Sequence, residues 1–232
     1  MRIAIVGTGR MGQAVATEAA ARGHEVVARI GRTDNPNGTG LTRERLAAAE
    51  VIVEFTRPDT VVANLERLIG LGIPVVTGTT GWGADLSRLT SLAQSEGGTF
   101  LHAANFSLGL QLLLEAARTL GARLANRPEL DAGLFEQHHR KKVDAPSGTA
   151  LAIQAALRGV DPGREYPITS ERLGWIPGTH RLSIDGEFET LTLTHAVRDR
   201  RVFAAGAVTA AEWLVGQRGV FTFQDVIRGA DA

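Results

Sequence analysis

The 232-residue sequence predicts an α/β protein in which a doubly wound parallel sheet is followed by a smaller α+β part. Three observations carry this prediction. Short apolar segments alternate with amphipathic ones through about residue 105. The first apolar segment runs into a glycine-rich turn, Gly7–Gly12, that opens a helix. After residue 180 the apolar residues recur with a period of two, which is typical of antiparallel strands.

The first part of the chain has the order of a βαβ unit. Residues 2–6 are apolar on both faces, as in a strand covered by helices on each side. A helix over 13–21 and a strand over 24–30 complete the unit. The alternation then continues with helices expected over 41–49, 59–70 (Asp59 as its N-cap) and 84–95, and with strands over 51–55, 74–77 and 99–103.

The second part begins after Asn105. A long helix is expected over 108–123, a strand over 131–137 and a helix over 148–157. The stretch 181–208 reads mainly as strands, with a hairpin turn at Asp185-Gly186 between 182–184 and 191–195. A helix over 210–215 could return to the first domain and make that domain discontinuous.

Composition excludes several classes of protein. Hydrophobic residues make up 44% of the chain and charged residues 22%, which is typical of a globular protein with one or two cores. The 25 basic residues balance the 25 acidic ones, so no nucleic-acid partner is expected. There is no cysteine, which excludes disulfides and thiolate chemistry. No apolar stretch reaches the roughly 18 to 20 residues of a membrane span, and the apolar run near the start covers only residues 3–6, so a cytoplasmic location is expected.

The turn between the first strand and the first helix has the spacing G-x-G-x-x-G. Small residues there let the backbone approach a pyrophosphate, and the free N–H groups of the helix N-terminus attract its charge. The alternative is a merely tight turn. The βαβ context favours dinucleotide binding by Gly7, Thr8, Gly9, Arg10, Met11 and Gly12.

The end of the second strand bears on the choice of cofactor. An NAD site usually has an acidic residue there, but the sequence reads Arg29-Ile30-Gly31-Arg32. Arg32, with Arg29 as a second candidate, would pair with a ribose 2′-phosphate, which favours NADPH over NADH. A solvated surface arginine is the alternative.

Two further loops follow strands of the same sheet and should lie at its ligand-binding carboxyl edge. Ordinary turns are the alternative for both. The candidate residues for the nicotinamide half of the cofactor are Gly78, Thr79 and Thr80 in one loop and Ala103, Ala104, Asn105 and Phe106 in the other.

The segment 136–150 concentrates the candidate chemistry. A basic run that includes His138, His139 and Lys142 follows a strand and could bind anions, while Gly148 and Thr149 open a helix whose free N–H groups favour a carboxylate. A histidine beside a lysine suits acid catalysis near a carboxylated substrate. A surface charge run is the alternative. No metal is expected, because adjacent histidines of a strand point to opposite faces and no third ligand is evident nearby.

With these motifs together, the chain resembles the dihydrodipicolinate reductase (4-hydroxy-tetrahydrodipicolinate reductase) family nearly from end to end. The signature H-H-x-x-K-x-D-A-P-S-G-T-A, residues 138–150, is the most specific part of the resemblance. The other matching motifs are Gly7–Gly12, Glu54–Pro58, Gly78–Gly81 and Ala104–Ser107.

The resemblance implies a Rossmann-like dinucleotide-binding domain, residues 1–106 and 203–232, and a substrate-binding domain, residues 107–202, whose mixed sheet builds a homotetramer. It implies reduction of 4-hydroxy-tetrahydrodipicolinate, a small dicarboxylate, to tetrahydrodipicolinate with NADPH or NADH in the diaminopimelate route to lysine. Another Rossmann dehydrogenase and a non-catalytic NADP(H) sensor are the alternatives.

The resemblance also implies roles for individual residues. His138 would exchange the proton with Lys142 as its partner, and His139, Lys142, Gly148 and Thr149 would bind the substrate carboxylates. Arg200 and Phe203 would approach the nicotinamide end of the cofactor, which the loops named above would hold. The chain departs from the family at 172–180, where it is shortened, and at Gly31, which replaces a common Glu and again favours NADPH.

Overall fold

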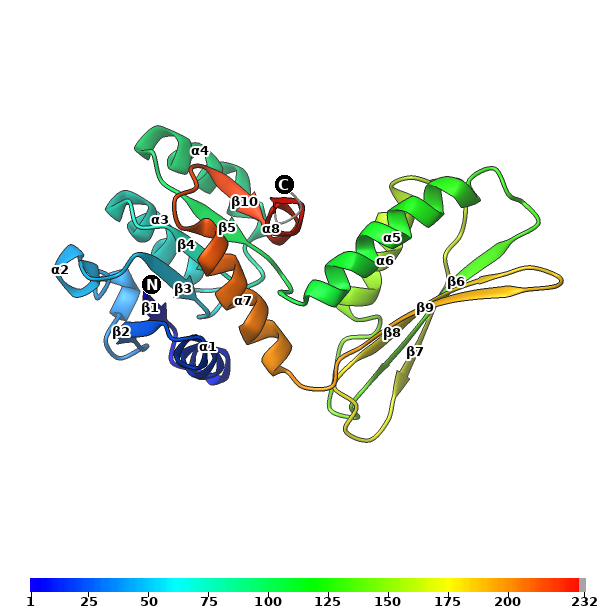
Figure 1. Cartoon of the computed structure of the whole chain (residues 1–232), viewed down its shortest axis with the longest axis horizontal. Coiled ribbons are helices and arrows are strands. Elements are labelled where there is room, and N and C mark those ends of the chain that lie inside the picture. The colour runs from blue at the N-terminus through cyan, green and yellow to red at the C-terminus, as the bar shows by residue number, and fades with distance from the viewer. Residues whose placement is uncertain (230–232) are drawn as a thin grey trace. The chain divides into compact units, whose positions relative to one another are not determined.

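In the computed structural model, which describes residues 1–229, a six-stranded parallel sheet organises the first of two compact units (Figure 1). The strand order is β10-β5-β4-β3-β1-β2, and every neighbouring pair is parallel. The crossovers run in both directions from β1, which is the doubly wound arrangement expected from the sequence. The strands are β1 Arg2–Val6, β2 Glu25–Ile30, β3 Val51–Glu54, β4 Val75–Thr77, β5 Phe100–His102 and β10 Val220–Thr222.

Helices cover both faces of this sheet, which explains why its central strands are apolar throughout. One core contains Ile3, Ile5 and side chains of α1 (Arg10–Ala21) and α7 (Arg201–Leu214). The other core contains Ala4, Val6 and side chains of α3 and α4. The remaining bounds in this unit are α2 Arg43–Leu46, α3 Val61–Leu71, α4 Leu86–Glu96 and α8 Phe223–Gly229, with short 3-10 helices at Pro36–Gly38 and Gly83–Asp85.

The first unit is discontinuous in sequence. It comprises Met1–Phe106 and the C-terminal part from Arg201 on, and the second unit is Ser107–Arg200. The division falls two residues before the expected boundary at 203. Residues 230–232 of the expected range 203–232 lie outside the described residues.

The expectation of strands as far as residue 208 was wrong, because residues 201–214 form α7. This segment is rich in alanine, the residue with the highest helix propensity. Its buried residues include Ala204, Ala207, Val208 and Ala211, which have the spacing of one helix face rather than that of a strand.

Two helix starts also differ from those expected. The helix expected over 41–49 is limited to α2, whose N-cap Thr42 accepts a hydrogen bond from the Arg45 N–H. The N-cap of α3 is Thr60 rather than Asp59. The Asp59 carboxylate instead pairs with the exposed Arg57 side chain at 3.3 Å.

The second unit is a four-stranded mixed sheet of order β7-β6-β8-β9. The pair of β6 and β7 is parallel and the other two pairs are antiparallel, so the sheet is mixed as the family resemblance implied. Leu113, Leu134 and Ile153 contribute to the core between the sheet and its two helices. The elements are α5 Leu108–Leu124, β6 Asp131–His138, α6 Gly148–Arg158, β7 Ile168–Arg172, β8 Thr179–Asp185 and β9 Thr190–Ala196.

The hairpin expected around Asp185-Gly186 joins β8 to β9, and the Gly186 N–H donates to the Glu189 carbonyl at 2.9 Å. The pattern missed β7, since its sequence ITSER has one apolar residue. Within residues 1–229, no helix combines the length and apolarity needed to cross a bilayer.

Candidate active site

The glycine-rich turn sits at the carboxyl end of β1. Gly7 has φ 100°, and a Cβ there would lie 2.0 Å from the Phe55 carbonyl oxygen. A Cβ on Gly12 would lie 1.8 Å from the Gly7 carbonyl oxygen, so both positions require glycine. Helix α1 begins directly after Gly9, whose position provides no side-chain cap. The first N–H groups of α1 are therefore available to an anion.

The loop after β2 contains a carboxylate that sequence reasoning missed. The Asp34 side chain folds back, and its Oδ2 accepts a hydrogen bond from the Gly31 N–H at 3.1 Å. The residues that end the strand, 29–32, include no carboxylate, as the sequence analysis states, but the fold of the loop brings the carboxylate of Asp34 to the same place. Arg32 is exposed in the same loop.

Glu54 ties together the loops that follow β3 and β4. Its buried carboxyl accepts hydrogen bonds from the Thr77 hydroxyl at 2.5 Å and the Thr56 N–H at 3.0 Å. The Thr56 N–H also lies 2.8 Å from the Thr79 hydroxyl. Burial raises the pKa of Glu54, although these donors oppose the rise. Gly78 is confined by the Phe55 ring, which a Cβ would approach to 2.0 Å.

The loop after β5 is anchored by Phe106. Its buried ring packs edge-on against Phe55 and Phe223, with centroid distances of 5.9 and 5.2 Å. Of the other residues expected at the cofactor, Phe203 lies in the first turn of α7. Arg200 is the last residue of the second unit.

In the second unit, the segment 136–150 connects β6 to the start of α6. The Ser147 hydroxyl caps α6 by accepting from the Ala150 N–H at 3.2 Å. Gly148 is exposed, and among the described residues a Cβ on it would meet no heavy atom within 4 Å other than those of its chain neighbours and of the backbone of α6. The first N–H groups of α6, at Gly148 and Thr149, face no partner within the helix. This helix start can therefore bind a carboxylate, as the sequence indicates.

Glu136 and His138 lie two residues apart on β6 and therefore on the same face. The Glu136 carboxylate is fully buried, and its Oε1 accepts from the Ser147 N–H at 3.0 Å, the Ser170 hydroxyl at 2.7 Å and the Arg172 guanidinium at 2.8 Å. Burial acts to raise the pKa of Glu136, but these donors outweigh it and lower the pKa to about 2. Glu136 is therefore ionised at neutral pH.

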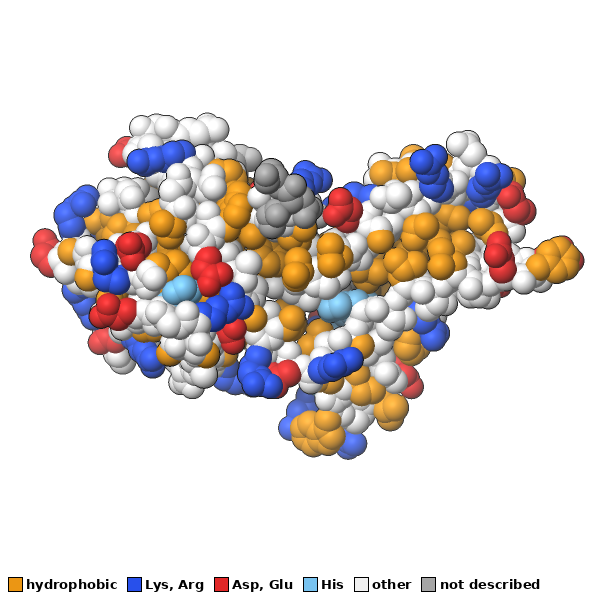
Figure 2. Space-filling view, in the orientation of Figure 1, with side chains coloured by type: hydrophobic (Ala, Val, Ile, Leu, Met, Phe, Trp, Pro, Cys, Tyr) orange, Lys and Arg blue, Asp and Glu red, His pale blue; other side chains and the backbone are white. Residues whose placement is uncertain are grey.

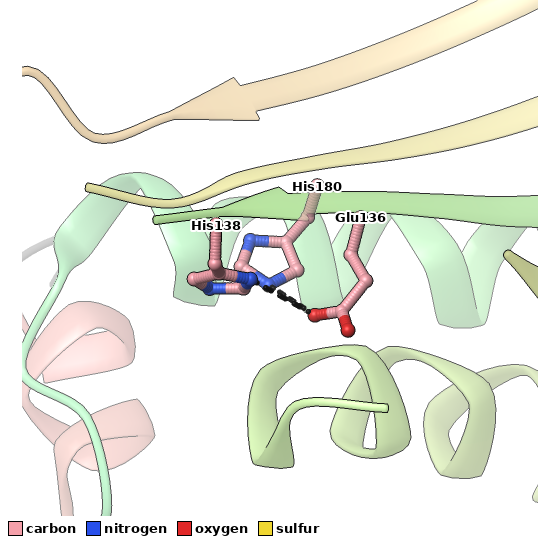
Figure 3. Close-up of side chains that lie close together, drawn as sticks. All are labelled: Glu136, His138 and His180. Carbon is pink, nitrogen blue, oxygen red and sulfur yellow. Dashed lines mark ion pairs between the residues drawn. The ribbon is translucent and has the colours of Figure 1, made fainter. Parts of the chain in front are cut away.

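The other carboxylate oxygen faces two imidazoles, and Figure 3 shows the three side chains pointing toward one another. Glu136 Oε2 lies 3.2 Å from His138 Nδ1 and 3.8 Å from His180 Nε2. Burial lowers the pKa of His138, which Glu136 opposes, and burial together with the neighbouring His138 lowers the pKa of His180 to about 4.

Sequence reasoning did not assign His180 to the site. It lies on β8, and the β6–β8 register places it directly opposite Glu136. Only the strand pairing could have revealed this proximity. Lys142 is the residue expected to act as the partner of His138. Its ammonium binds the Asp144 carboxylate at 2.8 and 2.9 Å. Lys142 acts on His138 through its charge, which lowers the pKa of the imidazole.

The expectation that no third metal ligand lies near the histidines was also wrong. Glu136, His138 and His180 offer ligand atoms that lie within 4.8 Å of one another. The Arg172 guanidinium, however, binds the same carboxylate and adds a positive charge that disfavours a cation. The arrangement resembles a carboxylate that orients an imidazole for proton transfer.

The first unit has a parallel sheet with a glycine-rich dinucleotide turn, and the second carries a buried imidazole and an open helix start. These features define a two-domain oxidoreductase of the nicotinamide-dependent class. The family model for the N-terminus of dihydrodipicolinate reductase matches residues 1–106, and that for its C-terminus matches residues 109–227. The chain belongs to the dihydrodipicolinate reductase family.

Two relatives agree with this membership, and one solved structure has a similar fold. The 4-hydroxy-tetrahydrodipicolinate reductases of Gluconobacter oxydans and Natronomonas pharaonis are 39% and 36% identical to the chain. The first comparison covers 98% of this chain and 97% of the relative, and the second covers 98% and 100%. The dipicolinate-bound dihydrodipicolinate reductase from Paenisporosarcina sp. TG-14 has a TM-score of 0.82 at 23% identity, over 97% of this chain and 98% of the other. That likeness concerns the fold.

Proposed function

We propose that the protein catalyses the NAD(P)H-dependent reduction of 4-hydroxy-tetrahydrodipicolinate to tetrahydrodipicolinate in the diaminopimelate route to lysine. The observation that carries the proposal is that one buried carboxylate, Glu136, contacts both the imidazole of His138 and the backbone at the start of α6. The Glu136 carboxylate thereby fixes the position of a proton donor relative to a carboxylate-binding helix start. Family membership over nearly the whole chain supports the same reaction.

The second unit would bind and protonate the substrate. The N–H groups of Gly148 and Thr149 would bind one substrate carboxylate, and the side chains of His139 and Lys142 would add positive charge at the other. When bound, NAD(P)H would supply the hydride that reduces the ring carbon of the conjugated imine left after loss of water. His138, in its protonated form, would then give a proton to the neighbouring ring atom.

The first unit would hold the cofactor. The turn Gly7–Gly12 and the N-terminus of α1 suit the pyrophosphate, and the loops after β4 and β5 suit the nicotinamide half. We propose that NADPH is preferred and NADH also used, because Arg32 can pair with a 2′-phosphate. The Asp34 carboxylate in the same loop would favour a ribose hydroxyl and so limit the preference.

The protein would act as a cytoplasmic homotetramer. Several large apolar side chains are exposed on the second unit, including Trp175, Phe188 and Leu191, and Figure 2 shows hydrophobic side chains on the surface of this part of the chain. Exposed apolar surface of this kind is typical of an interface between protein chains. Light scattering of the purified protein measures the number of chains directly.

The proposed reaction is tested in a coupled assay in which the preceding synthase makes the unstable substrate from pyruvate and aspartate semialdehyde. Wild-type protein should oxidise NADPH, and His138→Gln should lower kcat at least about 100-fold while changing the cofactor Kd little. His24→Gln, in the first unit, is the matched control and should behave as wild type. Equal losses of turnover and cofactor binding in His138→Gln would contradict the assignment. Cofactor binding without turnover in the wild type would favour a sensor.

A further inference from the structure

The two oxygens of the Glu136 carboxylate contact different groups. Oε1 is occupied by three donors that would suffice for a purely structural role, namely the Ser147 N–H, the Ser170 hydroxyl and the Arg172 guanidinium. Oε2 is turned toward His138 Nδ1 at 3.2 Å. This contact falls short of hydrogen-bond geometry, and neither atom has a hydrogen-bond partner within residues 1–229. Catalytic hydrogen bonds are often this loose before substrate binds and tighten in the complex.

Ser147 links the same carboxylate to the anion-binding helix start. Its N–H binds Glu136, its hydroxyl caps α6, and the same hydroxyl lies 3.1 Å from His180 Nε2. Glu136 thus contacts the residue immediately before Gly148, where the N–H groups proposed for the substrate carboxylate begin. A displacement of Glu136 would move the helix start and the imidazole together.

We propose that Glu136 is a positioning residue for His138. It holds the imidazole as the Nδ1–H tautomer and links it to the start of α6. The Nε2 atom of His138 is then the one that exchanges the proton with the substrate. This inference deepens the proposed reaction and rests on it. The surroundings of Nε2 agree with this assignment. Gly178 lies beside it, and a Cβ at that position would come within 3.1 Å of Nε2. Glycine therefore keeps this side of the ring uncrowded.

Charges around His138 make the proposal testable by pH. Burial lowers the pKa of His138 most, Lys142 and Arg172 lower it further, and Glu136 and Asp144 raise it. His180, a further titratable neighbour, packs edge-on at a centroid distance of 5.0 Å. Its pKa of about 4 leaves it neutral near pH 7. Removing the charge of Glu136 should therefore make His138 harder to protonate.

The experiment is a ¹⁵N NMR titration of the imidazoles, paired with kcat against pH. In the wild type, neutral His138 should carry its hydrogen on Nδ1. In Glu136→Gln the His138 midpoint should move to lower pH, and kcat at pH 8 should fall about 10- to 100-fold with the KM for NADPH unchanged. Glu136→Asp keeps the charge and should retain the midpoint and recover part of kcat.

The matched control is Glu171→Gln, the same chemical change on the neighbouring strand β7. Glu171 is paired in register with Gln137 and contacts its side chain. Gln137 follows Glu136 on β6, and successive side chains of a strand point to opposite faces, so this contact lies on the face of the sheet opposite to Glu136. The control should leave both the titration of His138 and the pH profile unchanged.

Two results would overturn the proposal: an Nε2–H tautomer in the wild type, or a His138 midpoint that Glu136→Gln leaves in place. If Glu136→Gln does not fold, the tautomer of His138 in the wild type decides the question. The NMR measurement requires no turnover. A wild-type protein that does not reduce the substrate would therefore refute the proposed reaction without affecting the test of Glu136.

Discussion

Replacing Arg32 by alanine should lower kcat/KM for NADPH about 30-fold and leave that for NADH nearly unchanged. Two unit charges 4 Å apart interact by about 1 kcal/mol in water, and Arg32 is exposed, so the aqueous value applies. A 2′-phosphate carries nearly two negative charges at neutral pH. The lost interaction is therefore roughly 2 kcal/mol, or about 30-fold in rate at 1.4 kcal/mol per tenfold.

The assay measures initial rates with each cofactor in the coupled synthase reaction at about 0.05 and 0.5 M salt, since screening should shrink the effect at the higher concentration. Asp34→Asn, in the same loop, should shift the ratio in the opposite direction, because it removes the negative charge beside Gly31. Arg67→Ala, which removes an exposed arginine from α3, controls for the loss of one positive charge.

An equal fall with NADPH and NADH would refute the reasoning, since only one of the two cofactors carries the phosphate. Unchanged use of NADPH would show that Arg32 is a solvated surface side chain. If Asp34→Asn left the ratio of kcat/KM for NADPH to that for NADH unchanged, the role of the carboxylate would be limited to stabilising the turn through its hydrogen bond to the Gly31 N–H.

Three further predictions concern the turn, the core and acid stability. Gly12→Ala, whose Cβ would meet the Gly7 carbonyl oxygen at 1.8 Å, should weaken NADPH binding at least about 10-fold in a fluorescence titration; unchanged binding would contradict the close packing. Tyr166→Phe removes a buried hydrogen bond of 2.9 Å to Asp161 and should cost about 1 to 3 kcal/mol in urea unfolding, and no loss would contradict the buried pairing. The pKa of His180 falls from 6.5 to about 4 on folding, so only the unfolded chain gains this proton as the pH drops from 6.5 toward 4, and the free energy of unfolding falls. His180→Gln should make this decline shallower by about 1.4 kcal/mol per pH unit. An unchanged slope of the free energy of unfolding against pH would refute the assignment.

Much of the fold could be read from local patterns. The first strand is apolar on both faces because helices cover both sides of the parallel sheet, and that burial leaves a direct trace in the residues. Gly7 and Gly12 could be assigned to a tight turn because no other residue fits their backbone surroundings. Residues 201–208 were misread, because apolar residues dense enough for a buried helix can also look like a strand.

The sequence by itself determined the alternation of strands and helices, the dinucleotide turn, and the placement of His138 and the α6 start in one short segment. These features depend on neighbours in the chain, so residue spacing records them. Only the tertiary structure brought His180 opposite Glu136 and folded Asp34 back onto Gly31. Strand register and side-chain orientation decide such contacts, and they depend on the packing of distant segments, which leaves no local pattern.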